Sequence, residues 1–394
     1  MRCFFPMPTR LPRCARAAVI FPIIIIIMIT ICLSGCSPAA GIYANYRAME
    51  ELQTVQALAL DRNVDGTVTL TAAVQRAGDD GGDAPTVLSA DGSSIPEALA
   101  QLQRRTVQGE LFFAHVRYLL LGQALAEHGI GPVLDYVERD VHTRMAAELF
   151  VLRDGRADEL FSAVGDGAAI AELLTSVRRD AELRGGSRVY SVRSTAVALS
   201  EYGAAPICAL RTVSAPEDDG GASVLPDGCG ILRGGMLAGF LDGGEAEMLR
   251  MLTGEAGMVS RSFPDSDGGT VTLELRGSAE LSCPAPSVTE VTLNVDAVIA
   301  AVSDPEAPVT DGAYLSRLSD TVSAAMEAQA FRVLELSKST DADFLALARP
   351  LRRCTGTESL PPDWLRQTEF RLHTEVSVRH SYDLSEQPGT EGSA

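Results

Sequence analysis

The sequence predicts a mixed α/β or α+β fold of antiparallel-rich sheets and packed helices, divided over more than one domain. Three observations lead to this prediction. Short strand and helix patterns alternate through the first half of the chain, which favours helices layered against a sheet. Two long segments, 270–281 and 288–298, alternate apolar and polar residues as half-buried strands do. The segment 311–336 repeats apolar residues at helical spacing throughout.

Residues 1–35 have the organisation of a bacterial lipoprotein signal peptide. Four arginines and no acidic residue accompany an apolar run over 17–32, which is short for a bilayer-spanning helix and contains Pro22. The run leads into Leu33-Ser34-Gly35-Cys36, where small residues admit a peptidase and the Cys36 thiol is the nucleophile for a lipid. We therefore expect lipidation of Cys36 and a tether over residues 36–48 that holds the folded part near the bilayer.

The segment 49–213 predicts an N-terminal domain of alternating strands and helices. It opens with a hairpin whose second strand alternates apolar residues with threonines. After an acidic loop over 78–91, Ser94 and Glu97 form a capping-box pattern that begins a helix. The expected strands are 55–61, 67–74, 111–121, 147–152 and 194–199, and the further expected helices are 123–127, 133–139, 157–164 and 168–183.

Residues 214–227 are acidic and rich in Gly and Pro, which predicts a linker. The segment 228–384 then predicts a C-terminal domain, and the polar residues 385–394 predict a disordered tail. The elements expected in this domain are a tight hairpin at 230–241, a helix at 245–252, strands at 270–281, 288–298 and 370–380, the helix 311–336, and a loop around Trp364.

The charge of the chain excludes one class of partner. The chain has 33 Lys and Arg residues against 52 Asp and Glu, a net charge of −19 over 394 residues. Loss of the leader would remove four arginines and no acidic residue, leaving a net charge of −23. Such a surface repels nucleic acid and anionic headgroups, so we expect no nucleic-acid partner and expect the lipid to make the membrane contact.

The cysteines beyond Cys36 are Cys208, Cys229, Cys283 and Cys354. They form no Cys-x-x-Cys motif and have no histidine at ligand spacing, so we expect no metal site and no cofactor. Cys208 and Cys229 bracket the acidic segment. Two interpretations stay open, a disulfide that staples this segment and a pair of buried free thiols.

No motif in the sequence requires an enzyme. The segment Asp61–Gly66 fits the first half of an EF-hand calcium loop, but the twelfth position, which needs a glutamate, is Ala72, so a hairpin turn is the better interpretation. His115 lies in the expected strand 111–121, where a hydrogen-bonded structural histidine is the better interpretation. We therefore expect no catalytic residues.

Several segments in a fixed order resemble the Ger(x)C spore germination lipoproteins, the C subunits of nutrient germinant receptors. In the first half these are Met49 to Asp61, the strand 67–74, Gly92 to Leu99, Leu111 to His115, Gly129 to Asp140 and Phe150 to Leu160. In the second half these are the hairpin 228–242, the strands 270–298, the helix 311–336, Asp341-Ala342-Asp343-Phe344-Leu345 and Trp364. The order and spacing of the segments carry this resemblance more than any single motif.

The resemblance implies a multi-domain mixed α/β fold and a place on the outer face of the inner spore membrane. It also implies assembly with a membrane-embedded A subunit and a transporter-like B subunit. Two other classes stay open, an extracytoplasmic substrate-binding lipoprotein and a membrane-tethered cell-wall hydrolase. The first needs a two-lobed doubly wound core, and the second needs paired carboxylates in a cleft.

Arg349, Arg352 and Arg353 are the candidate partner-binding residues. They lie in the arginine-rich run 347–357 of an otherwise acidic chain. Clustered basic side chains can meet acidic loops of a partner or anionic lipid heads. A solvated loop whose arginines pair with the protein's own carboxylates is the alternative interpretation.

Overall fold

The computed structural model describes residues 52–76, 86–106, 110–140, 143–183, 186–214, 222–255, 257–265, 268–285, 287–304, 307–357 and 359–380. The strands of the first half and the hairpin that follows form one sheet, called sheet A. Its strands are β1 (Leu52–Arg62), β2 (Val68–Arg76), β3 (Val87–Gly92), β4 (Glu110–Phe112), β5 (Tyr118–Gly122), β6 (Glu148–Leu152), β7 (Tyr190–Ser191), β8 (Ala204–Ser214), β9 (Ala222–Arg233) and β10 (Met236–Leu241).

Sheet A has a parallel centre and antiparallel edges. The main order is β10-β9-β8-β6-β5-β1-β2-β3. The neighbours β1, β5, β6 and β8 run parallel to one another, while β2 and β3 on one side and β9 and β10 on the other add as hairpins. The parallel strands are buried on both faces, as parallel strands require, because the helices that connect them cover both sides.

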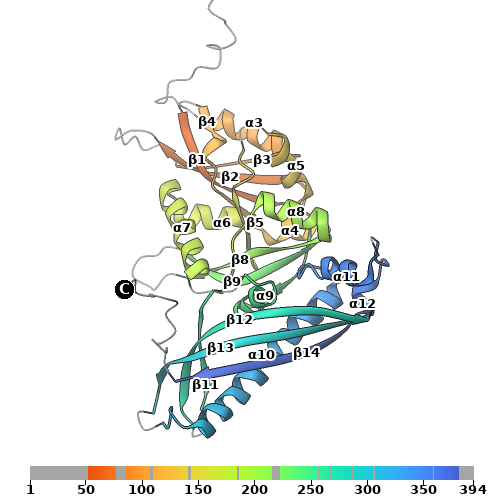
Figure 1. Ribbon diagram of the computed structural model, residues 1–394. Coiled ribbons are helices and arrows are strands. Elements are labelled where there is room, and N and C mark those ends of the chain that lie inside the picture. The colour runs from red at the N-terminus through yellow and green to blue at the C-terminus, as the bar shows by residue number, and fades with distance from the viewer. Residues whose placement is uncertain are drawn as a thin grey trace, which may run out of the picture. The chain divides into compact units, whose positions relative to one another are not determined.

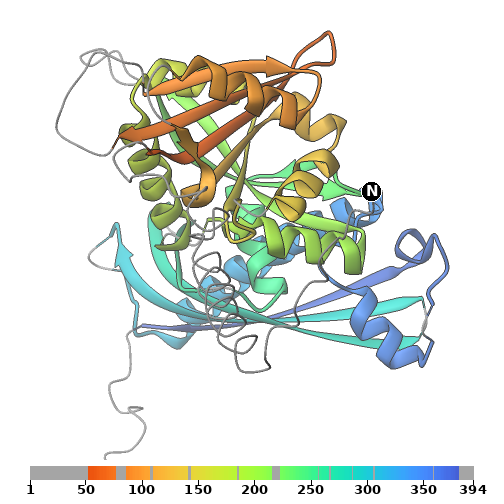
Figure 2. The ribbon, with the colours of Figure 1, turned by 90° about the horizontal axis from the view of Figure 1, so that it is seen from above.

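Helices cover both faces of sheet A, and Figure 2 shows the two layers on opposite sides of the strands. One layer contains α3 (Ile95–Arg105), α4 (Gln123–His128), α5 (Gly131–Arg139) and α8 (Val192–Tyr202), and the other contains α6 (Ala157–Val164) and α7 (Gly167–Leu183). Alternate residues of each strand face alternate layers. In β5, for example, Leu119 and Leu121 pack on the first layer and Tyr118 and Leu120 on the second.

The second half forms a separate sheet, sheet B, with one helical side. The strands β11 (Val259–Pro264), β12 (Thr270–Ala285), β13 (Val288–Val302) and β14 (Glu369–Arg379) follow the order β11-β12-β13-β14. The pairs are antiparallel except β13 with β14, which are parallel. The long helix α10 (Gly312–Thr340) packs along these strands (Figure 1), and its buried side chains recur at helical spacing.

Helix α9 (Gly243–Leu252) packs against both β9 and β12. Its buried residues belong to the same apolar cluster as Ile231 of sheet A and Leu273 of sheet B. Residues 222–227, which the sequence predicts as part of the linker, form the first half of β9, and β9 pairs with β8. Helix α9 therefore connects the last strand of sheet A, β10, to the first strand of sheet B, β11.

Most of the expected elements are confirmed. The hairpin β1–β2 closes through Asn63, whose N–H bonds Thr67 O at 2.8 Å, so the calcium-like segment is a turn. Helix α3 is capped by Ser94, which accepts a hydrogen bond from the Glu97 N–H. The observed β12 and β13 cover their predicted segments, and β14 and α10 cover all but one terminal residue of theirs.

The predicted strand 111–121 is wrong. The chain forms β4, then one 3-10 turn over Phe113–His115, then β5, and both strands pair with β1. The apolar residues on the two sides of His115 therefore belong to different strands. His115 is exposed on the turn, with its ring 5.5 Å from that of Phe112, so it does not lie in a strand as the sequence predicted.

The predicted strand 194–199 is helix α8. Ser191 accepts a hydrogen bond from the Ser194 N–H at 3.2 Å, and Gly203 ends the helix with φ 69°. These capping interactions favour a helix over the predicted strand.

Three shorter segments also differ from the sequence predictions. The loop expected over 78–91 ends earlier, because β3 begins at Val87. The run 347–357 contains helix α11 (Ala348–Thr355), and Trp364 begins the short helix α12 (Trp364–Gln367) rather than lying in a loop.

In the part of the chain that the structure describes, no single helix is long and apolar enough to span a membrane; the bent pair α6–α7 passes that test by length and composition alone.

Candidate functional site

Helix α11 brings the three predicted arginines together on one surface, called the arginine face (Arg349, Arg352 and Arg353). Residues three and four positions apart lie side by side on a helix, so Arg352 and Arg353 both neighbour Arg349. All three side chains are exposed, whereas Ala348 and Leu351 on the other side are buried and hold the helix against the protein. The helix thus directs cationic groups outward.

The arginine face forms no ion pair with the carboxylates that the structure describes. Among the described residues, none of the three guanidinium groups forms an ion pair with Asp or Glu, whereas arginines elsewhere, such as Arg233 and Arg261, do. Arg349 hydrogen-bonds the Tyr202 hydroxyl, and the charge of Arg352 acts on Asp343. The alternative interpretation of a solvated loop is wrong in one respect, because the three arginines stand on helix α11.

Asp343 holds the start of α11. The helix has no capping side chain at its own N-cap, Leu347. Instead the Asp343 carboxylate accepts hydrogen bonds from the Leu347 N–H at 2.7 Å and the Ala348 N–H at 2.9 Å. Asp343 is only 5% exposed, and this burial raises its pKa to about 7, although the two N–H donors and Arg352 favour the charged form.

Asp341 connects the segment before α11 to the hairpin of sheet A. It ends α10 in the left-handed region with φ 53°. Its carboxylate pairs with Arg233 at 2.6 Å and with Arg366 at 3.8 Å, and Arg233 also donates to the Asp341 carbonyl oxygen at 2.9 Å. Asp341 therefore ties the segment before α11 to β9, and Asp343 caps the first turn of α11.

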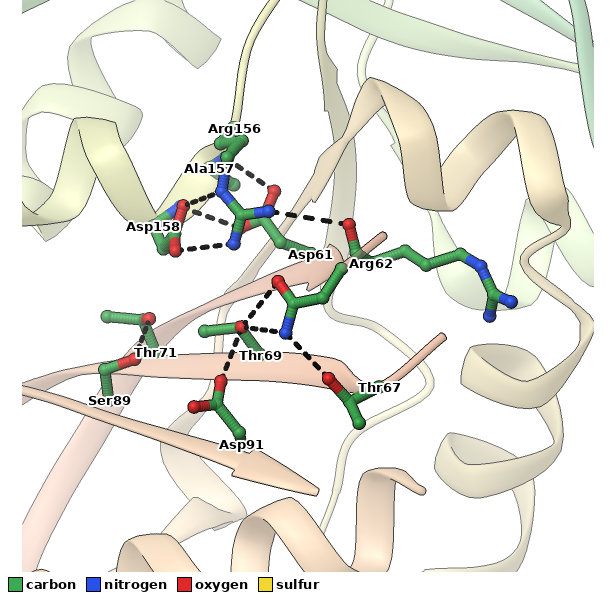
Figure 3. A network of polar contacts seen from close by, with 11 residues as sticks. Asp61, Arg62, Thr67, Thr69, Thr71, Ser89, Asp91, Arg156, Ala157 and Asp158 are labelled. Carbon is green, nitrogen blue, oxygen red and sulfur yellow. Dashed lines mark hydrogen bonds and ion pairs between the residues drawn. The ribbon is translucent and has the colours of Figure 1, made fainter. Parts of the chain in front are cut away.

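A second buried aspartate, Asp61, caps the start of helix α6 in the way that Asp343 caps α11, as Figure 3 shows. Asp61 at the end of β1 is 2% exposed and accepts hydrogen bonds from the Ala157 N–H at 2.9 Å and the Asp158 N–H at 2.8 Å. Burial raises its pKa to about 6 against the effect of these donors. Gly122 is required beside it, because a Cβ there would lie 1.9 Å from Asp61 Oδ1.

A cavity of about 620 Å³ opens beside this network, between the β1–β2 turn, α3 and α5. Its walls include Val68, Ile95, Leu125 and Val133. Its charged residues include Asp135 and Arg139, which pair with each other at 2.6 Å. Arg62 points away from the polar network in Figure 3 and lines the cavity.

The other predicted site residues, all of them cysteines, are not part of the arginine face. Cys36 lies outside the described residues. Cys208 and Cys229 are buried thiols at opposite positions of β8 and β9. Within the described ranges no cluster of three or more His, Cys, Asp or Glu side chains could hold a metal ion.

Sequence reasoning missed the roles of Asp61 and Asp343. Both stand in the segments that carry the family resemblance, which was the available signal. The hydrogen-bond partner of Asp61 could not be predicted from the neighbouring sequence, because Ala157 lies 96 residues further along the chain.

Comparison with known proteins identifies both halves of the chain. Residues 45–208 match the family described as spore germination protein N-terminal domain, and residues 227–382 match the family described as spore germination B3/GerAC like, C-terminal. Spore germination protein KC of Bacillus subtilis (strain 168) is 27% identical over 148 residues. That alignment covers 35% of this chain and 34% of the relative, about a third of its length.

The crystal structure of the GerBC protein has a similar fold. It aligns with a TM-score of 0.51 and 17% identity over 82% of this chain and 96% of that chain. The expected mixed fold of the family is thus confirmed. Because the two family matches together span most of the chain, the protein belongs to the Ger(x)C family of spore germination proteins.

Proposed function

We propose that this chain is a non-enzymatic, lipid-anchored subunit of a spore germinant receptor, needed for germination in response to nutrients. It assembles with the membrane-embedded A and B subunits on the outer face of the inner spore membrane. Family membership supports the role in germination. The leader and Cys36 support the anchor, since the lipid gives a strongly acidic protein a membrane contact that its charge would oppose.

The arginine face is the observation that carries the assembly part of the proposal. Three exposed guanidinium groups, which form no ion pair within the described part of the chain, stand on one short helix of a protein with net charge −19. Complementary charge steers encounter and fixes the register of two surfaces. A partner with acidic loops therefore docks on α11. The rest of this protein's surface is acidic and repels such loops.

The alternative functions receive less support from the fold. An importer's substrate-binding protein needs two doubly wound lobes, whereas sheet B pairs mostly antiparallel and has α10 along it. In the described residues, the two strongly buried aspartates serve as helix caps through backbone N–H donors rather than facing each other across a cleft, as a hydrolase needs.

Replacing Cys36 with alanine tests the anchored-receptor proposal. The Cys36→Ala precursor is expected to keep its leader, carry no diacylglycerol and leave spores with a lost or strongly slowed response to nutrients. Mass spectrometry of the N-terminal peptide and germination assays check the two parts. The response to a non-nutrient trigger is expected to stay normal, because the rest of the germination machinery is intact.

Cys32→Ala is the matched control, since it removes a thiol from the same leader without touching the acceptor position. Its product is expected to be processed and lipidated like the wild type. A wild-type N-terminus that is processed but free of lipid would contradict the anchor. Normal nutrient germination in spores that lack the chain altogether would contradict the receptor function.

A further inference from the structure

The four described cysteines fall into two pairs with different surroundings. Cys208 on β8 lies opposite Cys229 on β9 in the strand register. Cys283, near the end of β12, contacts the thiol of Cys354 in the last turn of α11. The sequence allowed three pairings among these residues, and the fold selects one.

The pair inside sheet A is closed to external reagents. Cys208 is 0% exposed and Cys229 is 2% exposed. The Ser187 hydroxyl hydrogen-bonds Cys208 Sγ at 3.5 Å, and burial raises the pKa of both thiols, to about 12 for Cys208. Thiol–disulfide exchange needs a thiolate and an approach path to its sulfur. The pair in sheet A lacks the approach path, because both sulfurs are enclosed.

The second pair is accessible and already positioned. Cys354 is exposed, and Cys283 is half-buried. Burial and the neighbouring Cys354 thiol raise the pKa of Cys283, whereas a hydrogen bond with the side chain of Thr289, itself 2% exposed, lowers it. Helix α11 packs directly against β12, and this packing places the Cys354 thiol in contact with the Cys283 thiol.

We propose that Cys283 and Cys354 form a disulfide that ties α11 to sheet B when the protein meets a disulfide-bearing oxidant. The exposed Cys354 thiolate attacks the oxidant's disulfide and releases one thiol. The Cys283 thiolate then attacks Cys354 Sγ and releases the second thiol. The protein loses two protons and two electrons, and the oxidant's disulfide takes them up to become two thiols.

The bridge would fix the C-terminal end of α11, as Asp343 fixes its N-terminal end. Closing the long loop between residues 283 and 354 restricts the unfolded chain and raises the melting temperature. The arginine face would then be held in one orientation on sheet B. This inference does not depend on the proposed receptor function, because it concerns two thiols of this chain alone.

The test uses the purified full chain, reduced, freed of reductant and exposed to oxidised glutathione while folded. The expected product contains a peptide pair linked through Cys283 and Cys354, two hydrogens lighter than the two reduced peptides together, and melts several degrees higher than the reduced form. Cys208 and Cys229 are expected to react with maleimide only after denaturation. In Cys283→Ser, Cys354 is expected to carry a stable glutathione adduct instead of a bridge.

The proposal is overturned if oxidation leaves Cys283 and Cys354 as separate glutathione adducts or free thiols in the folded wild type. A linked peptide that joins Cys208 to Cys229 in place of this pair also overturns it. The Cys283→Ser variant keeps the test interpretable if the bridge changes folding, because its thiol chemistry is read in the folded protein by mass.

Discussion

Replacing Asp343 with alanine is expected to melt helix α11 and to lower the free energy of unfolding by about 2–4 kcal/mol. The variant leaves the Leu347 and Ala348 N–H groups buried without an acceptor, since α11 has no other capping side chain. Denaturant unfolding of the purified protein measures the loss. Circular dichroism at low denaturant is expected to show reduced helix content before the global transition.

Asp320→Ala provides the matched control for Asp343→Ala. Asp320 is exposed on α10, so its removal is expected to change the free energy of unfolding by less than about 0.5 kcal/mol. Asp343→Asn keeps one carbonyl oxygen as acceptor, so its loss in free energy of unfolding is expected to lie between those of Asp343→Ala and Asp320→Ala. Equal stabilities for Asp343→Ala and Asp320→Ala would contradict the capping role.

The same aspartate makes stability depend on pH with a defined sign. Burial raises the pKa of Asp343 from 3.8 to about 7, so between these values the folded state binds more protons than the unfolded state. The contribution of Asp343 therefore decreases as pH rises from about 4 to about 7. The stability advantage of the wild type over Asp343→Ala is expected to be larger at pH 5 than at pH 8.

Replacing Asp61 with alanine is the second change with a large expected effect, again about 2–4 kcal/mol of destabilisation. Two N–H groups at the start of α6 lose their acceptor, and a buried site at the centre of sheet A loses its side chain. Thermal and denaturant unfolding measure the loss. Lower receptor abundance in spores is expected to follow.

Gly122→Ala provides an internal check on Asp61, because the new Cβ would meet Asp61 Oδ1 at 1.9 Å. Alone it is expected to destabilise the protein strongly. In the Asp61→Ala background the clash is absent, so the same substitution is expected to cost much less. Additive effects of the two substitutions would show that the carboxylate does not occupy this place.

The sequence predicted the elements whose own residues carry the signal. Helix α10 and the strands β12 and β13 have long periodic patterns, and α3 has its cap in the residues beside it. Helix α11 was missed because it is short, contains Pro350 and buries only Ala348 and Leu351, too few for a periodic pattern. Its cap, Asp343, lies four residues before its N-cap, outside the usual capping position.

The candidate site was predicted in part. The arginines were found as a cluster in the sequence, but their common face depends on α11 being a helix. The exposure of His115 depends on a turn between two strands that pair with the same neighbour, β1, which local sequence does not encode. Contacts between distant segments, such as Asp61 with Ala157, arise only once sheet A has formed.

The most direct measurement is co-purification of the tagged chain with the A and B subunits from spore membranes, quantified by mass spectrometry. Arg352→Glu with Arg353→Glu reverses two charges of the arginine face and is compared with Arg104→Glu with Arg179→Glu, two exposed arginines on α3 and α7. The control has the same net charge change and is expected to retain its partners. The arginine-face variant is expected to stay folded and lose about 10-fold or more of the co-purified subunits. Equal recovery of the membrane subunits with both double variants, at low and moderate salt, would contradict docking through α11.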